Sequence, residues 1–297
     1  MDIGVDPAMA VTVALASRAP RSIAEAAELV ARIAPTLEAL AARPAGIPPR
    51  LADLEPELTL DPEVARIRPD VGDHELRGRL VFRELLGKRS FFQVAALAIG
   101  GIEISASDAE LLEQLGINTQ LADARIWPLA VVRRVAARSG MTYGVLAGAA
   151  VALNPNMGAR PVGDFMRALD RFEADGRPMP LQLETIVARH ERIPGVGRPV
   201  LGPDERNAQV VALAQKYGRD NGPSWKLALA IDEFFHSRKK QHINAAGLQG
   251  ALMRDIGFSP TAASAFCFLY FFVQILAQAV DAEERIHRRN AGHGRAA

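Results

Sequence analysis

The segment Thr261–Val280 contains twenty residues without one charged side chain, and this run limits what the chain can fold into. A helix of that length is long enough to cross a bilayer, or else it must be buried inside a protein core. Gln274 and Gln278 lie four residues apart on one helical face, and a basic stretch follows from His287. Because the rest of the sequence contains no similar run, we predict a buried core helix and no membrane span.

Composition narrows the class of protein further. The 35 Lys+Arg and 34 Asp+Glu residues leave a formal net charge of +1, so the chain lacks the basic excess that drives binding to nucleic acid. Hydrophobic residues make up 49% of the chain and charged residues 23%, as in folded globular proteins. The single cysteine, Cys267, excludes an internal disulfide and a zinc site built from several cysteines. We expect no metal centre and a cytoplasmic location.

Apolar residues recur at helical spacing along nearly the whole chain, without the sustained alternation of half-buried strands. We therefore predict an all-α fold. Capping boxes at Ser22–Glu25 and Ser107–Glu110 predict helix starts, Ser90 and Asp73 predict two more, and Gly116 predicts a stop. The remaining predicted helices are Trp127–Ala137, Thr142–Leu153, Pro161–Ala174, Pro203–Tyr217, Ser224–Phe235, Ala245–Ile256 and the long apolar helix that begins at Pro260.

Few residues indicate chemistry on spacing alone, since no HExxH, GxSxG, Walker or GxGxxG pattern is present. Gly195 and Gly197 predict a tight turn, and Arg198 beside them has a planar guanidinium suited to an anion. His236 and His242 flank a basic stretch that could also meet an anion, although a solvated helix end is the simpler interpretation.

Segments in a consistent order resemble the citrate synthase superfamily. Ile193–Asn207 resembles the family's Gly-x-Gly-His-Pro-Val and Asp-Pro-Arg motifs, and Ile243–Pro260 resembles its Asn-Val-Asp-x-x-x-Gly segment. Leu76–Gly101 is similar to the family's Arg-Gly opening, and Asp123–Pro128 is similar to the short citryl-CoA lyase branch. The resemblance extends from residue 76 to residue 284 and leaves the beginning of the chain unmatched.

The resemblance implies a division into domains and a mode of assembly. It implies a large helical domain (71–160 plus 258–297), a smaller inserted helical domain (161–257), and an N-terminal extension and linker (1–70). It also implies a homodimer, centred on Thr142–Leu153 and Thr261–Val280. The implied ligand is a CoA thioester, as a substrate and not as a tightly bound cofactor.

The family's chemistry makes or breaks a carbon–carbon bond at an acyl-CoA, and this chain departs from the residues used for it. Met157 and Arg198 stand at the two histidine positions, and Ala246 stands at the position of the aspartate base. Tyr270 aligns with an arginine of the last helix, whereas Arg206 matches the Asp-Pro-Arg arginine. Alanine cannot accept a proton and methionine cannot donate a hydrogen bond, so the standard mechanism is expected to be lost.

Two interpretations follow from these departures. In one, the protein is an acyl-CoA carbon–carbon lyase or acyltransferase with chemistry rebuilt around Arg198, Asn244, Tyr270 and Arg206. In the other, it is a non-catalytic pseudoenzyme that binds CoA or a carboxylate, or that serves as the partner of an active paralogous subunit. The resemblance implies ligand-binding positions at Arg198, Arg206, Gly195, Gly197 and Gly158. An alternative role for Arg198 is to pair with Asp204 or Glu205 and close the cleft.

Overall fold

The computed structural model describes residues 64–120, 123, 127–153, 158–198 and 202–293. The predicted cap at Ser22–Glu25, most of the predicted 1–70 extension, and Met157 lie outside the described residues. Of the described residues 69% are helical, which confirms the predicted all-α class. The helices are α3 (Phe91–Gly100), α4 (Ala106–Thr119), α5 (Trp127–Ser139), α6 (Met141–Ala152), α7 (Arg160–Asp175), α8 (Met179–Ala188), α9 (Asn207–Lys216), α10 (Pro223–Lys239), α11 (Ala245–Ile256) and α12 (Pro260–His293).

A small antiparallel sheet replaces the helix predicted after Asp73, and that prediction is wrong. The strands are β1 (Ala65–Arg68), β2 (Asp73–Leu76) and β3 (Arg79–Leu80), paired in the order β1-β2-β3. The turn between β2 and β3 consists of Arg77 and Gly78, both with positive φ (48° and 80°), which a continuous helix does not allow.

Asp73 nevertheless acts as a cap, but for a turn on the far side of the hairpin. Its buried carboxylate accepts hydrogen bonds from the backbone N–H groups of Phe82 (2.9 Å) and Arg83 (3.2 Å). These two residues lie in a single π-helical turn over Val81–Leu85. The carboxylate therefore satisfies N–H groups that a short turn leaves without intrahelical partners.

The helix starts follow capping rules, with one displacement from the prediction. Ser90 and Gln93 form the reciprocal capping box that opens α3, as the sequence predicts. At α4 the cap is Ser105 and not Ser107, because the Ser105 hydroxyl accepts from the Asp108 N–H at 3.0 Å. Helix α8 was not predicted.

Gly116 is not a helix stop, as the sequence analysis proposed, but a packing contact inside α4. A Cβ added at Gly116 would lie 2.7 Å from the Tyr270 ring, so the aromatic side chain occupies the space that a larger residue would need. The Tyr270 hydroxyl donates to the backbone carbonyl of Leu112 at 2.8 Å. This contact fixes α4 against α12.

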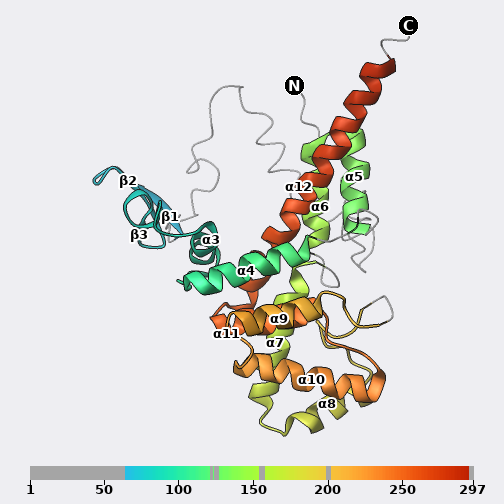
Figure 1. Cartoon of the computed structure of the whole chain (residues 1–297). Coiled ribbons are helices and arrows are strands. Elements are labelled where there is room, and N and C mark those ends of the chain that lie inside the picture. The colour runs from blue at the N-terminus through green and yellow to red at the C-terminus, as the bar shows by residue number, and fades with distance from the viewer. Residues whose placement is uncertain (1–63, 121–122, 124–126, 154–157, 199–201, 294–297) are drawn as a thin grey trace, which may run out of the picture.

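Two hydrophobic clusters organise the described residues, and α12 belongs to both. The larger cluster contains buried residues of α3, α4, α7–α11 and the first half of α12. The smaller cluster joins α5 and α6 to the second half of α12, which Figure 1 shows as the long red helix beside them. The large cluster includes Leu111 and Phe165, which lie on opposite sides of the predicted 160/161 boundary, so the division into domains stays a prediction.

Helix α12 passes the length and composition test for a membrane span, with a mean hydropathy of 1.8 over its most apolar window. Only 39% of that window is buried within the chain. Phe266, Cys267 and Tyr270 face the larger cluster, whereas Val273 is 57% exposed. The helix therefore serves as a core element and also leaves an apolar face without cover from the described residues.

The contact between Gly116 and Tyr270 gives the first prediction. Gly116→Ala should lower the free energy of unfolding, because overpacking costs about 1–3 kcal/mol and outweighs the roughly 1 kcal/mol that alanine gains in a helix. Urea denaturation measures the change. In a Tyr270→Leu background the ring is absent, so Gly116→Ala should be neutral or stabilising; equal destabilisation in both backgrounds would contradict the packing role.

Candidate functional site

The turn at Gly195–Gly197 is joined to the residues that precede α11. Gly195 and Gly197 both have positive φ (81° and 77°), as predicted for a tight turn. Between them Val196 forms an isolated antiparallel bridge with Ile243. The backbone N–H of Asn244 donates to the Gly195 carbonyl at 2.8 Å. The turn and the start of α11 therefore form one local unit.

Glycine is required on both sides of this unit. A Cβ at Gly195 would lie 2.8 Å from the Gly247 Cα, and a Cβ at Gly247 would lie 2.7 Å from the Gly195 carbonyl oxygen. The two backbones are thus in direct contact, which explains why glycines recur here without forming a dinucleotide-binding loop.

Asn244, which the sequence analysis considered as a catalytic residue, is the N-cap of α11. Its Oδ1 accepts from the N–H groups of Ala246 (3.0 Å) and Gly247 (3.3 Å). Its Nδ2 donates to the Gly197 carbonyl at 2.8 Å. Both ends of the amide are used to hold the turn on the helix, and Ala246 adds no titratable group beside it.

Asp204 is the buried anion of the site. It receives a bidentate pair of hydrogen bonds from Arg206, with Nε at 2.9 Å and Nη2 at 2.8 Å, and a third from the N–H of Ala245 at 3.1 Å. Burial alone would raise the pKa of the Asp204 carboxyl, but these hydrogen bonds hold the pKa below its usual value. Sequence reasoning considered Asp204 only as an alternative partner of Arg198.

Arg198 pairs mainly with Glu205, the residue after Asp204. Its Nη1 lies 2.5 Å from Glu205 Oε2, 3.0 Å from the Pro203 carbonyl oxygen and 3.9 Å from Asp204. The Glu205 side chain is 72% exposed, compared with 23% for Arg198. The hydrogen bond from Arg198 lowers the pKa of Glu205. The structure therefore contains an ion pair between Arg198 and Glu205, which the sequence analysis considered as an alternative role for Arg198.

Tyr270 and Gly158, two further residues that the sequence analysis assigned to the site, form no hydrogen bond with the described residues of the Gly195–Arg206 loop. Tyr270 is buried among Phe92 and Phe266, its hydroxyl is bound to Leu112, and burial raises its pKa well above the usual value. Gly158 precedes α7, where its positive φ and a hypothetical Cβ only 2.1 Å from the Ala152 carbonyl oxygen require glycine. The structure thus groups Gly195, Gly197, Arg198, Arg206 and Asn244, and it places Tyr270 in the core.

The basic stretch between His236 and His242 includes the last residues of α10 and the short loop that follows. The His236 and His242 rings stack with centroids 4.2 Å apart, and His242 Nδ1 lies 3.3 Å from Asp232 Oδ1. Asp232 also accepts from the Ile243 N–H at 2.6 Å. The two histidines therefore support the bridge that leads into α11.

A cavity of about 220 Å³ adjoins the turn and extends between α7, α8 and residues 189–193. Ile193, two residues before Gly195, is one of its lining residues. The charged side chains that line it are four arginines and two acids: Arg171, Arg177, Arg189, Arg192, Asp175 and Glu191. The cavity is thus cationic, and the described residues contain no cluster of three metal-ligating side chains.

The Asp204 contacts predict a difference between two neighbouring acids. Asp204→Asn should lower the free energy of unfolding by about 2–3 kcal/mol, because a buried, charged hydrogen-bond partner is lost. Glu205→Gln should change it by less than about 0.5 kcal/mol, because this pair is exposed. Since folding lowers the pKa of Asp204, its stabilisation is complete above the unfolded value near 4 and is lost as pH falls below it. Thermal melts between pH 7 and 3 measure both effects; equal losses would contradict the assignment.

Comparison with known proteins identifies the fold. No family model and no curated protein matches the sequence. Among solved structures, the chain is similar to citryl-CoA lyase from Hydrogenobacter thermophilus, with a TM-score of 0.65 and 19% identity over 74% of this chain and 85% of that chain.

Two further solved structures are similar to the chain. The ATP citrate lyase of Methanosaeta concilii, in complex with (3S)-citryl-CoA, gives a TM-score of 0.60 and 18% identity over 92% of this chain, but only 47% of that chain. Citrate synthase from Thermoplasma acidophilum, in complex with carboxymethyl coenzyme A and oxaloacetate, gives 0.51 and 17% over 66% of this chain and 53% of that chain. The chain therefore has the helical fold of citrate synthase and citryl-CoA lyase, as the resemblance of its segments predicted.

Proposed function

We propose that the chain binds a CoA thioester or a related carboxylate at the Gly195–Arg206 loop and the start of α11, without the standard citrate synthase chemistry. The observation that carries the proposal is the pairing of Arg198 with an exposed acid while the buried acid is saturated by Arg206. Solved structures of this fold hold coenzyme A with citrate, or citryl-CoA.

The two arginines have different tasks in this proposal. Arg206 is committed to Asp204, so it maintains the frame of the loop. Arg198 binds Glu205, and exposed ion pairs contribute only about 0–1 kcal/mol. A ligand carboxylate can therefore replace Glu205 at little cost, and the planar guanidinium can hold it with two hydrogen bonds.

The adjoining cavity suits the phosphates of a CoA ligand. Asp175 pairs with Arg177 and Glu191 lies 3.8 Å from Arg189, so the acids of the lining already face two of its four arginines. The charge of Arg171 and Arg192 remains unbalanced within the lining. In this proposal a carboxylate or carbonyl of the ligand lies at Arg198, and its phosphates lie against the arginines of this cavity.

The groups at the loop favour binding over catalysis. Removing the α-proton of a thioester requires a base within hydrogen-bond reach. Ala246 stands where the family has its aspartate, and a guanidinium or a carboxamide cannot accept the proton. The low pKa of Asp204 makes it a weak base at neutral pH. We therefore favour the pseudoenzyme interpretation over an acyl-CoA lyase or acyltransferase.

Calorimetric titration with CoA, acetyl-CoA and oxaloacetate tests the binding proposal. Arg198→Gln should weaken oxaloacetate binding by at least about tenfold while it changes the melting temperature little, because one charged hydrogen-bonding group is lost. Arg238→Gln, which removes an exposed arginine from the end of α10, is the charge-matched control and should change neither value. If Arg198→Gln lowers the melting temperature and wild-type protein binds none of the three compounds, Arg198 is a structural clamp and the proposal is wrong.

Activity assays address the missing base separately. Wild-type protein should turn over acetyl-CoA with oxaloacetate, and cleave citryl-CoA, at rates near background. CoA release followed with a thiol reagent measures the first reaction. Robust turnover in either assay would overturn the alignment of Ala246 with the aspartate position and support the lyase or acyltransferase interpretation.

We also propose that the protein is a cytoplasmic homodimer in which a second copy covers the exposed apolar face of α6 and α12. Leu146 on α6 is 59% exposed and Val273 on α12 is 57% exposed. Val280 of α12 and Leu153, the residue after α6, are also exposed, so apolar residues are exposed on α12 and at α6 and its C-terminal end. An active paralogous subunit is the alternative occupant, because the same surface would accept a similar chain.

Light scattering at micromolar concentration should give the mass of a dimer. Leu146→Glu combined with Val273→Glu should give a monomer, because buried charges without partners oppose association. Ile67→Glu changes an even more exposed apolar residue, on β1, and should leave the dimer intact. A wild-type monomer would contradict the homodimer, and a monomer that dimerises only with a citrate synthase-like paralogue would support the alternative.

A further inference from the structure

Arg198 binds a carboxylate that belongs to its own chain. Its Nη1 lies 2.5 Å from Glu205 Oε2, and the same nitrogen donates to the Pro203 carbonyl oxygen at 3.0 Å. A guanidinium and a carboxylate at this distance form a charge-assisted hydrogen bond, which is also the contact that Arg198 would make with a ligand carboxylate. Glu205 therefore presents to Arg198 the same chemical group as the ligand class proposed above.

The two neighbouring acids of the loop differ in how firmly they are held. The Asp204 carboxylate is buried and accepts hydrogen bonds from Arg206 and from the N–H of Ala245. It cannot leave these partners without leaving a charge buried and unpaired, which is costly. Glu205 is 72% exposed, so its side chain can turn into solvent without uncovering a buried group. Of the two acids, Glu205 is therefore the one that can be displaced from Arg198.

The attachment of Glu205 to the same chain gives it an advantage over a free carboxylate. The hydrogen bond from Arg198 lowers the pKa of Glu205, so this side chain is charged at neutral pH. The two residues are seven positions apart, and a group held on so short a segment has an effective concentration on the order of millimolar. A free carboxylate must also give up its translational freedom when it binds. A ligand therefore has to compete with Glu205 for the guanidinium.

We propose that Glu205 is an internal competitor for Arg198, which a ligand carboxylate must displace from the guanidinium in order to bind. This inference rests on the function proposed above and adds the regulation of that site. A single carboxylate offers Arg198 no contact that Glu205 does not already supply. Anions with further contacts overcome the competition, such as a dicarboxylate or a CoA thioester whose phosphates reach the arginines of the adjoining cavity. Glu205 thus excludes weakly bound monocarboxylates.

Calorimetric titration of the full chain with oxaloacetate, in wild-type and Glu205→Gln protein, tests the competition. Glutamine keeps the size of the side chain but removes its charge, so Arg198 should be easier to reach. We expect Glu205→Gln to bind oxaloacetate about two- to fivefold more tightly, the range that corresponds to an exposed ion pair of up to about 1 kcal/mol. The melting temperature without ligand should stay the same, which separates competition from a structural role.

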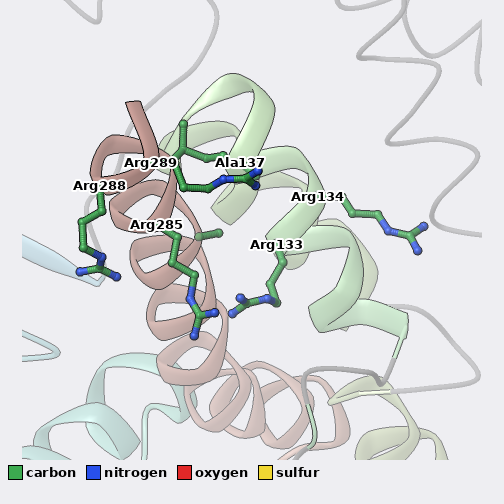
Figure 2. Close-up of a pocket in the computed structure, with 8 residues that line it drawn as sticks. Arg133, Arg134, Ala137, Arg285, Arg288 and Arg289 are labelled. Carbon is green, nitrogen blue, oxygen red and sulfur yellow. The ribbon is translucent and has the colours of Figure 1, made fainter. Parts of the chain in front are cut away.

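A matched control removes the same charge elsewhere. Glu284 is also an exposed acid paired with an arginine, since it lies 3.2 Å from Arg288. Figure 2 shows Arg288 on the last turns of α12, and Figure 1 places these turns at the opposite end of the structure from α9 and α11. Glu284→Gln should therefore leave the affinity for oxaloacetate unchanged.

A second background shows whether Glu205 acts through Arg198. In Arg198→Gln protein the guanidinium is absent, so adding Glu205→Gln should not change the affinity for oxaloacetate further. The two substitutions are then non-additive, as expected for residues in direct contact.

The possible outcomes separate this inference from the function on which it rests. Tighter binding by Glu205→Gln that disappears in the Arg198→Gln background supports the competition, and so does binding by Glu205→Gln when wild-type protein does not bind. Equal or weaker binding by Glu205→Gln overturns the competition but leaves the proposed function standing. Equal tightening in both backgrounds also overturns it, because the charge would then act without Arg198. If neither protein binds oxaloacetate, both the competition and oxaloacetate binding at this loop are wrong.

Discussion

The packing of one long helix on two separate hydrophobic clusters is the constraint on which the rest of this structure depends. The first half of α12 contributes Phe266 and Tyr270 to the cluster that also holds α3, α4 and α7–α11. Farther along the helix, Ile275 and Ala279 belong to the cluster with α5 and α6. Exposing an apolar run of this length to water is unfavourable, so both groups of helices pack against it. Their orientation relative to one another is therefore set by the same helix.

The loop at Arg198 is held in place by hydrogen bonds to backbone groups and by one buried ion pair. Asn244 caps α11 and holds Gly197, and Asp204 joins Arg206 to the N–H of Ala245. These contacts satisfy backbone groups and buried charge, so they stabilise the loop whether or not a reaction takes place there. The Ala246 side chain takes no part in them, because Ala246 makes its hydrogen bond at this cap through its backbone.

Sequence analysis predicted the helical class and most helix positions because apolar spacing and caps are local properties. It failed for residues 74–88, where Arg77 and Gly78 turn the chain into a hairpin in spite of a helix-like apolar pattern. It also failed for Gly116, whose role depends on Tyr270 more than a hundred residues later.

For the site, the same distinction between local and distant contacts decided what could be predicted. The tight turn at Gly195 and Gly197 follows from residue type, and it was predicted correctly. Asp204 pairs with Arg206 two residues later, but it also accepts a hydrogen bond from the Ala245 N–H of α11, 41 residues away, and this distant contact could not be predicted from the neighbouring sequence. Tyr270 was assigned to the site by alignment alone, and the aromatic packing that buries it was not visible in the pattern.

The position of α12 in chain order also has a consequence for how the protein is made. Every other described element precedes it, so during synthesis neither cluster can close until residues 260–293 have left the ribosome. Until then α3 and α4, together with α5 and α6, expose the faces that α12 later covers. The contacts between α12 and these helices join residues that are distant in sequence, and contacts of this kind form slowly. Until they form, the partly folded chain exposes apolar surface. The last helix to be synthesised is therefore the one that completes both hydrophobic clusters.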